Sequence, residues 1–395
     1  MLKLSIKKFK KVKSRKKSKA KAKAIAQAKA KIKIKIFFII FLTIIFFLNN
    51  IANILQNIKF YSNEIKQIKR VGVVNINIGL NIGNILVKYS MFKILEEMGF
   101  NSTIIVPKGG PLNFNLSFVN RTIGSHLLFV RKDFSNLKEE DFDYLMVSSD
   151  QTWGGLNLNV GFLKFAENWN VKKFIYASSA GRYQLPFREN NKFYIKSLLK
   201  NFTGISFREK GMVKLLEDSI GLKSEFVLDP TFLLNKNVYL NTIKNYHHSN
   251  FTKNDKFIFI YQLDRNYYIE KTIKKASELF NFKINKLQFN SNDYMESFLY
   301  GMNYCQAIIT DSFHGTVFSI IFNKPFLAFS NHGRGKARFD SLKELFSLYN
   351  RIIEPSSFSN VNINLLIEPL NINQSKFNEM KKFSLNYLKR NLGMV

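Results

Sequence analysis

From residue 71 onward, short apolar runs alternate with longer segments in which apolar side chains recur with helical spacing. The apolar runs predict strands, because they have the length and composition of buried parallel strands. They lie at 71–75, 103–106, 144–147, 173–177, 204–207, 225–228, 256–262, 283–289, 305–310 and 326–329. Strands that alternate with helices in this way predict parallel sheets covered by helices on both faces.

A polar stretch without periodicity, 241–255, divides the pattern into two halves. We therefore predict an N-terminal Rossmann-like domain at 71–240, a linker at 241–255 and a C-terminal Rossmann-like domain at 256–350. The fold class is α/β, with the two domains facing each other across a cleft. The extension at 351–395 contains an amphipathic segment, 375–390, which we expect to be a helix that packs back on the first domain.

The N-terminal region has a different character. Segment 36–48 is apolar except for Thr43, and its extension to residue 55 reaches the roughly twenty residues that cross a bilayer. We predict a basic cytoplasmic tail at 1–35, a membrane anchor at 36–55 and a polar spacer at 56–70. Three asparagines in the anchor leave an interfacial helix, a cleaved signal or a misassigned start open as alternatives. The side of the membrane on which the body lies stays open.

The net charge of +32 is unevenly spread, since sixteen of the 60 Lys and Arg residues lie in the first 35 positions. Such an excess fits a solvated basic surface, or a surface suited to anionic substrates or anionic lipid. Nucleic acid is not expected, because the chain shows no recognition motif. Cys305 is the single cysteine, which excludes an intrachain disulfide and a cysteine-built metal site, and we expect no metal.

A polar motif, Asp311-Ser312-Phe313-His314-Gly315-Thr316, separates the strand at 305–310 from an apolar helical segment. Its place at the carboxyl end of a strand and the amino end of a helix is where α/β sheets bind ligands and backbone N–H groups favour anions. An imidazole there can move a proton beside a bound phosphate. The alternative is a buried or helix-capping histidine bonded to Asp311.

Two further charged residues follow predicted strands. Asp150 suits activation of a hydroxyl, with Trp153 close enough in sequence to stack on a sugar, unless the carboxylate only braces its loop. Arg208 suits a phosphate or carboxylate ligand, unless it pairs with Glu209 or Glu217.

Small polar residues also occupy two turns. The turn after the first strand either lines the cleft or is a plain turn, and its residues are Asn81, Gly83 and Asn84. The spacing is not that of a dinucleotide-binding loop, so no NAD is inferred. Asp229-Pro230-Thr231 reads as a structural turn.

Five segments occur in a fixed order: Ser148 to Trp153, Tyr176 to Gly181, Ser206 to Glu209, Val227 to Thr231 and Thr310 to Ser319. In this order they resemble the polysaccharide pyruvyl transferase family, over about 71–351. The resemblance implies a two-domain fold like that of many glycosyltransferases, the GT-B arrangement. It also implies transfer of a pyruvyl group from phosphoenolpyruvate to a sugar of a glycan or polysaccharide, which forms a cyclic ketal.

The hypothesis that follows assigns a role to each candidate. His314 protonates the donor and Asp150 accepts the hydroxyl proton. The donor-binding residues are Arg208, Arg334, Arg338, Gly315 and Thr316. The residues lining the cleft on the acceptor side are Trp153, Asn81, Gly83, Asn84, Ser178 and Ser179. Phosphoenolpyruvate is the donor substrate, and no cofactor is expected.

One position departs from the family pattern. Many members carry arginine two residues before the histidine, where this chain has Ser312. Arg334 or Arg338 could supply the missing positive charge. Two other functions stay open: a GT-B glycosyltransferase that uses a nucleotide-sugar, and a membrane-anchored carbohydrate-binding protein that has lost catalysis.

Overall fold

The computed structural model of the chain describes residues 29, 31, 33, 35–54, 56 and 68–394, except 80, 109–116, 332 and 334. Contacts divide the chain into two units, Met1–Ile68 and Lys69–Val395. In the first unit, Lys35–Ile54 forms a helix of 20 residues with a mean hydropathy of 2.2 and exposed side chains. This helix is long and apolar enough to be a membrane anchor or a signal sequence.

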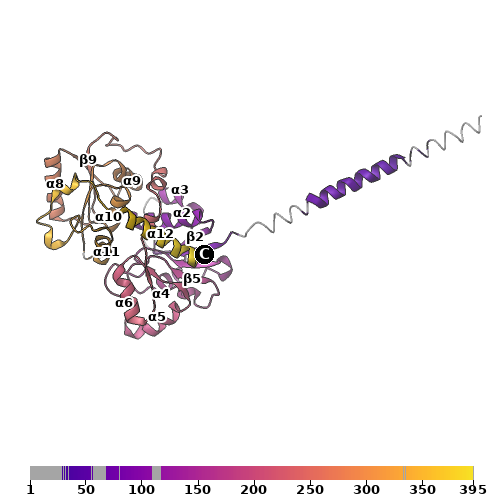
Figure 1. Cartoon of the computed structure of the whole chain (residues 1–395), viewed down its shortest axis with the longest axis horizontal. Coiled ribbons are helices and arrows are strands. Elements are labelled where there is room, and N and C mark those ends of the chain that lie inside the picture. The colour runs from indigo at the N-terminus through magenta and orange to yellow at the C-terminus, as the bar shows by residue number, and fades with distance from the viewer. Residues whose placement is uncertain are drawn as a thin grey trace, which may run out of the picture. The chain divides into compact units, whose positions relative to one another are not determined.

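The first sheet of the larger unit has six parallel strands in the order β3-β2-β1-β4-β5-β6 (Figure 1). The strands are β1 Arg70–Val74, β2 Asn101–Pro107, β3 Leu127–Val130, β4 Tyr144–Val147, β5 Lys172–Ile175 and β6 Phe202–Gly204. The helices are α2 Ile82–Glu97, α3 Ser117–Thr122, α4 Leu158–Phe162, α5 Lys192–Leu199 and α6 Lys210–Ile220. A short parallel pair of strands, β7 Ser206–Phe207 and β8 Glu225–Phe226, lies beside this sheet. The strand order reverses between β1 and β4, which is the Rossmann switch point.

The second sheet has five parallel strands in the order β10-β9-β11-β12-β13. They are β9 Phe257–Tyr261, β10 Lys283–Lys286, β11 Ala307–Thr310, β12 Phe326–Phe329 and β13 Ile352–Ile353. The helices are α7 Lys236–Asn241, α8 Tyr267–Phe280, α9 Tyr294–Tyr304, α10 Phe313–Ile321 and α11 Lys336–Phe346. Strands β9, β11 and β12 are fully buried, which explains their continuous apolar sequences. Here the switch point lies between β9 and β11.

The last helix, α12 (Gln374–Asn391), returns to the first sheet, as predicted; Figure 1 shows it in yellow beside β5. Its Tyr387 hydroxyl donates to the carbonyl of Ile175 in β5 at 2.7 Å. Ser384 accepts from the backbone N–H of Leu228 at 2.9 Å. The C-terminal end of the chain therefore helps to hold the first half of the unit.

The predicted strands occur in the structure, with small differences at their ends. The apolar run 204–207 is split between β6 and β7. Two strands, β3 and β13, were missed. β3 lies at the edge of its sheet with three of its four residues only half-buried, and β13 has two residues, so neither leaves a clear pattern.

Candidate active site

At both switch points, the carboxyl ends of the strands face one small cavity of about 170 Å³. Asn81 follows β1, Asp150 follows β4, Leu263 follows β9, and the motif from Asp311 to His314 follows β11. Arg338 of α11 completes the charged lining. Ligands of open α/β sheets bind at such switch points. Because two switch points meet here, this cavity is the candidate active site.

His314 stands in the first turn of α10 and is 4% exposed. Ser312 caps the helix by accepting from the backbone N–H of Gly315 at 3.3 Å. The Nε2 atom of His314 lies 3.7 Å from Oδ2 of Asp229, which is an ion-pair distance rather than a hydrogen bond. Burial lowers the pKa of His314 below its ordinary value, and Asp229 only partly opposes this effect.

Asp229 is the partner of His314, although its sequence reads as a structural turn. Its Oδ1 accepts from the backbone N–H and the hydroxyl of Thr231, at 3.0 and 2.6 Å. Its Oδ2 accepts from Arg208 and, at 3.2 Å, from the hydroxyl of Ser149. Burial opposes ionisation, but Arg208 and His314 outweigh it and hold the pKa of Asp229 far below its ordinary range. The turn thus also supplies a permanent negative charge beside the imidazole.

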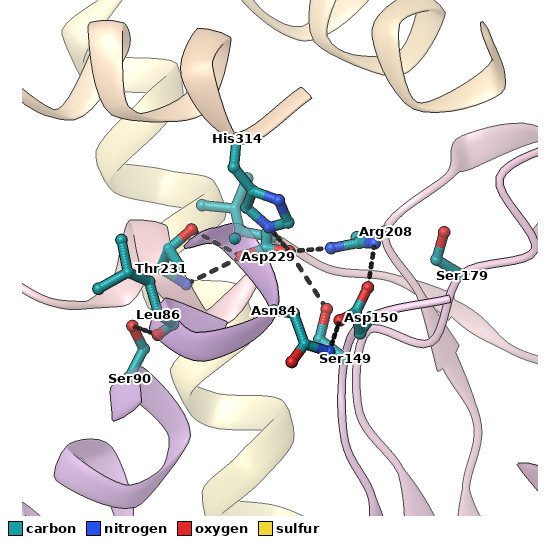
Figure 2. A network of polar contacts seen from close by, with 12 residues as sticks. Asn84, Leu86, Ser90, Ser149, Asp150, Ser179, Arg208, Asp229, Thr231 and His314 are labelled. Carbon is teal, nitrogen blue, oxygen red and sulfur yellow. Dashed lines mark hydrogen bonds and ion pairs between the residues drawn. The ribbon is translucent and has the colours of Figure 1, made fainter. Parts of the chain in front are cut away.

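Figure 2 shows Arg208 lying between the carboxylates of Asp229 and Asp150. Its Nη2 atom is 3.6 Å from Oδ1 of Asp150, and its side chain is 1% exposed. Arg208 does not line the cavity. Its ion pairs are with the two aspartates, and the charge of Glu209 acts on it as well. Donor binding by Arg208 stays a prediction. The guanidinium is buried because the two aspartates compensate its charge.

Asp150 is held at the cavity by its neighbours. Its Oδ2 accepts from the amide of Asn84 at 2.8 Å, and its Oδ1 accepts from the backbone N–H of Gln151 at 2.8 Å. The φ angle of Asp150 is 110°, a strained conformation for a residue with a side chain. Burial would raise the pKa of Asp150, but Arg208 and Lys88 outweigh it and bring the pKa below the ordinary value. The residue is therefore an ionised carboxylate with a fixed orientation.

Among the described residues, Arg338 is the arginine that lines the cavity. Its guanidinium lies 5.0 Å from the ring centroid of Phe313, and that of Arg208 lies 4.9 Å from the same centroid. Burial, together with the nearby charge of Arg208, lowers the pKa of Arg338 to about 10, so it stays a cation at neutral pH. Arg334, the other candidate, lies outside the described residues.

Three residues of the turn after β1 contact the cavity or the side chains that line it. Asn81 lines it and caps α2 by accepting from the N–H of Gly83 at 2.9 Å. Gly83 packs against the imidazole of His314, and Asn84 orients Asp150. The turn therefore positions both candidate catalytic side chains, which supports the cleft interpretation over a plain turn.

Several predicted contacts are contradicted by burial. Trp153 is 1% exposed, packs against Phe162 and Phe207, and donates to the carbonyl of Gly161 at 2.9 Å, so it cannot stack on a sugar. The hydroxyls of the two cleft serines are also internal: Ser178 bonds Thr152 at 2.5 Å and Ser179 donates to Glu209.

The N–H groups that were expected to bind the donor are occupied as well. The N–H of Gly315 is taken by the hydroxyl of Ser312, and both the N–H and the hydroxyl of Thr316 donate to the carbonyl of Ser312, at 3.0 and 3.1 Å. These bonds belong to the start of α10, so Gly315 and Thr316 shape the helix rather than contact a ligand.

Lys88 is a charged residue that the sequence analysis missed. It is 1% exposed on α2, one turn after Asn84, and its Nζ donates to the carbonyl of Asn84 at 3.3 Å. Burial lowers its pKa to about 8, and Asp150 opposes the shift. The available signal was its i, i+4 spacing from Asn84 within the mostly apolar stretch 82–92.

Two parallel sheets whose switch points meet at one charged cavity define an α/β enzyme of the GT-B-like class. UDP-GlcNAc 2-epimerase from Methanocaldococcus jannaschii has this fold: its structure superposes with a TM-score of 0.52 at 13% identity, covering 82% of this chain and 100% of the epimerase. HepE from Anabaena, solved with UDP and glucose, gives a TM-score of 0.45 at 8% identity, with 83% and 100% coverage. These similarities concern the fold alone.

The sequence model of the polysaccharide pyruvyl transferase family matches residues 81–333. The chain therefore belongs to this family of transferases, as the five motifs predicted. No curated protein matches the chain. Membership in the family implies a sugar or polysaccharide acceptor.

Proposed function

We propose that this protein transfers the pyruvyl group of phosphoenolpyruvate to two hydroxyls of one sugar, which forms a ketal and releases phosphate. The observation that carries the proposal is the pairing of a buried histidine, His314, with an aspartate, Asp229, at the cavity that Asp150 and Arg338 also line. His314 can give a proton, Asp150 can accept a proton, and Arg338 can bind the negative charge of the donor.

The size of the cavity supports a small donor. At about 170 Å³ it is well below the roughly 300–1,000 Å³ of drug-sized ligand pockets, and a three-carbon phosphate suits it better than a nucleotide-sugar does. Arg338 is a permanent cation in its wall, as an anionic donor requires. No metal and no cofactor enters this scheme.

In the first step, His314 donates its proton to the methylene carbon of phosphoenolpyruvate, which becomes a methyl group. The C2 atom gains cationic character, a sugar hydroxyl adds there, and Asp150 accepts the hydroxyl proton. A second hydroxyl then displaces phosphate from C2 and closes the ring. Of the two hydroxyl protons, one replaces the proton lost by His314 and the other leaves on phosphate.

Asp229 is a positioning residue in this scheme. Its carboxylate faces Nε2 of His314 and stabilises the imidazolium form, while its other oxygen is held by Thr231. Because burial keeps the free imidazole weakly basic, the negative charge of an arriving donor is what favours its protonation. The imidazole of His314 is then protonated mainly when phosphoenolpyruvate is bound.

The test is phosphate release by the purified full-length chain from phosphoenolpyruvate, with a panel of galactosides and mannosides. We expect His314→Ala and Asp150→Ala to lower the rate by about 10²-fold or more, the scale of general acid–base groups. His247→Ala is the matched control, since His247 is exposed and lies apart from the cavity. If a nucleotide-sugar is consumed and phosphoenolpyruvate is not, the protein is a glycosyltransferase instead.

A further inference from the structure

A second cavity, of about 360 Å³, adjoins the candidate active site. Asp311 belongs to the walls of both cavities, so ligands that fill them lie side by side. The second cavity is built by the loops after β9, β11 and β12 and by the segment after β13. The carboxyl ends of parallel strands therefore form its floor, which is the usual place for ligands in such sheets.

The chemistry of the two cavities differs. The small cavity is the candidate active site, lined by His314, Asp150 and Arg338. None of these three residues lines the second cavity, which is called the large cavity below. The small cavity cannot hold a sugar ring in addition to a donor, since about 170 Å³ is already small for one ligand. The reaction needs both molecules in contact, so the acceptor has to enter from a neighbouring space.

The large cavity offers an aromatic surface. Phe358 is half-buried at its edge, and the ring is held by Phe329 at 5.1 Å and by Tyr268 at 6.2 Å between centroids. A ring fixed in this way loses little entropy when a ligand packs on it. The C–H face of a sugar ring is apolar enough to pack against such a side chain.

The same cavity offers hydrogen-bond donors. Among the described residues, Arg265 is exposed and makes no hydrogen bond or ion pair. Asn266 uses its side-chain oxygen to cap α8, accepting from the N–H of Tyr268 at 2.9 Å, which leaves its amide N–H groups available. Asn331 donates to Asp264 at 2.8 Å and so ties two walls of the cavity together. Donors beside an aromatic face are the combination that a polyhydroxylated ring requires.

We infer that this cavity, between Phe358 and Arg265, is the acceptor subsite and binds the terminal sugar of the glycan. The sugar ring packs on Phe358, Arg265 and Asn266 donate to its oxygens, and its reacting hydroxyls point past Asp311 towards the small cavity. This inference rests on the proposed function, because it assigns the second substrate of that reaction.

The test measures sugar binding and turnover separately, on the full-length chain in detergent. Ligand-observed NMR titrations with methyl galactosides, methyl mannosides and UDP are done without phosphoenolpyruvate. Phe358→Ala should weaken glycoside binding about fivefold or more, and Arg265→Ala about tenfold. The affinity for phosphoenolpyruvate should not change in either variant. Phe193→Ala and Arg188→Ala are matched controls, because both side chains are exposed and line neither cavity.

Each outcome decides one of the two claims. Glycoside binding that is equal in wild type and Phe358→Ala overturns the subsite, even if phosphate is released. Binding of UDP in place of glycosides, or no binding of any glycoside to the wild type, also overturns it. Glycoside binding that both variants lose, without phosphate release from phosphoenolpyruvate, leaves the subsite standing and refutes the proposed function.

Discussion

Gly83 leaves the space that the imidazole of His314 occupies: a Cβ atom on Gly83 would lie 1.9 Å from Nδ1 of His314. The two residues belong to the first turns of α2 and α10, helices that follow strands of different sheets. A residue that reads as part of a flexible turn is therefore a packing partner of the candidate general acid.

We predict that Gly83→Ala lowers phosphate release at least tenfold while circular dichroism stays unchanged. Alanine favours a helix, so α2 should still form, but its methyl group displaces the imidazole. Gly79→Ala is the matched control from the same turn, because nothing lies within 4 Å of its Cβ position. Equal loss in both variants would show that the turn, rather than the imidazole, is disturbed.

Donor binding should be coupled to proton uptake. Burial places the pKa of His314 below its ordinary value, so the free protein holds a neutral imidazole at pH 7.5. The negative charge of phosphoenolpyruvate raises that pKa, and the complex should take up a proton, up to about one per site. Calorimetry in two buffers of different ionisation enthalpy measures the uptake. His314→Gln should abolish it, whereas unchanged uptake in that variant would contradict the assignment.

We predict that Lys88→Met changes the pH dependence of activity without lowering the stability of the fold. A buried ammonium with one hydrogen bond is costly, so the melting temperature should stay equal or rise. Removing the charge should also raise the pKa of Asp150 and move the acid limb of the pH–rate profile to higher pH. Lys173→Met is the control, because Lys173 is also buried but donates to Glu167 outside the cavity. An unmoved acid limb in Lys88→Met would remove Lys88 from the site.

Arg338→Ala should raise the KM for phosphoenolpyruvate about tenfold or more, and Arg338→Lys should recover only part of it, since a point charge cannot replace the guanidinium fork. Ser312→Arg in the Arg338→Ala background should restore some affinity. It should also cost about 1 kcal/mol of stability, because Ser312 caps α10. Donor affinity that is unaffected in Arg338→Ala would place the anion site elsewhere.

Deletion of residues 1–55 should release the protein from membranes and leave the body folded, because contacts separate Met1–Ile68 from Lys69–Val395. Membrane fractionation and thermal melting check the two parts of the prediction. The mass of the mature full-length protein distinguishes an anchor from a cleaved signal. A truncated chain that stays in the membrane fraction, or that does not fold, would contradict the anchor hypothesis.

Local pattern alone was enough to predict all strands except β3 and β13, the returning C-terminal helix, the family and the position of the His314 motif at a strand end. It was enough because buried parallel strands and helix starts leave their mark within a few neighbouring residues.

Only the tertiary structure decided which polar side chains reach the cavity. Asp229 and Arg208 both follow strands, yet the fold buries them as an ion pair behind His314, while Arg338 arrives from a helix of the other sheet. Trp153 stands three residues after Asp150 and points into an aromatic core. Exposure and pairing depend on which loops converge from distant parts of the chain, and no short-range pattern encodes that convergence.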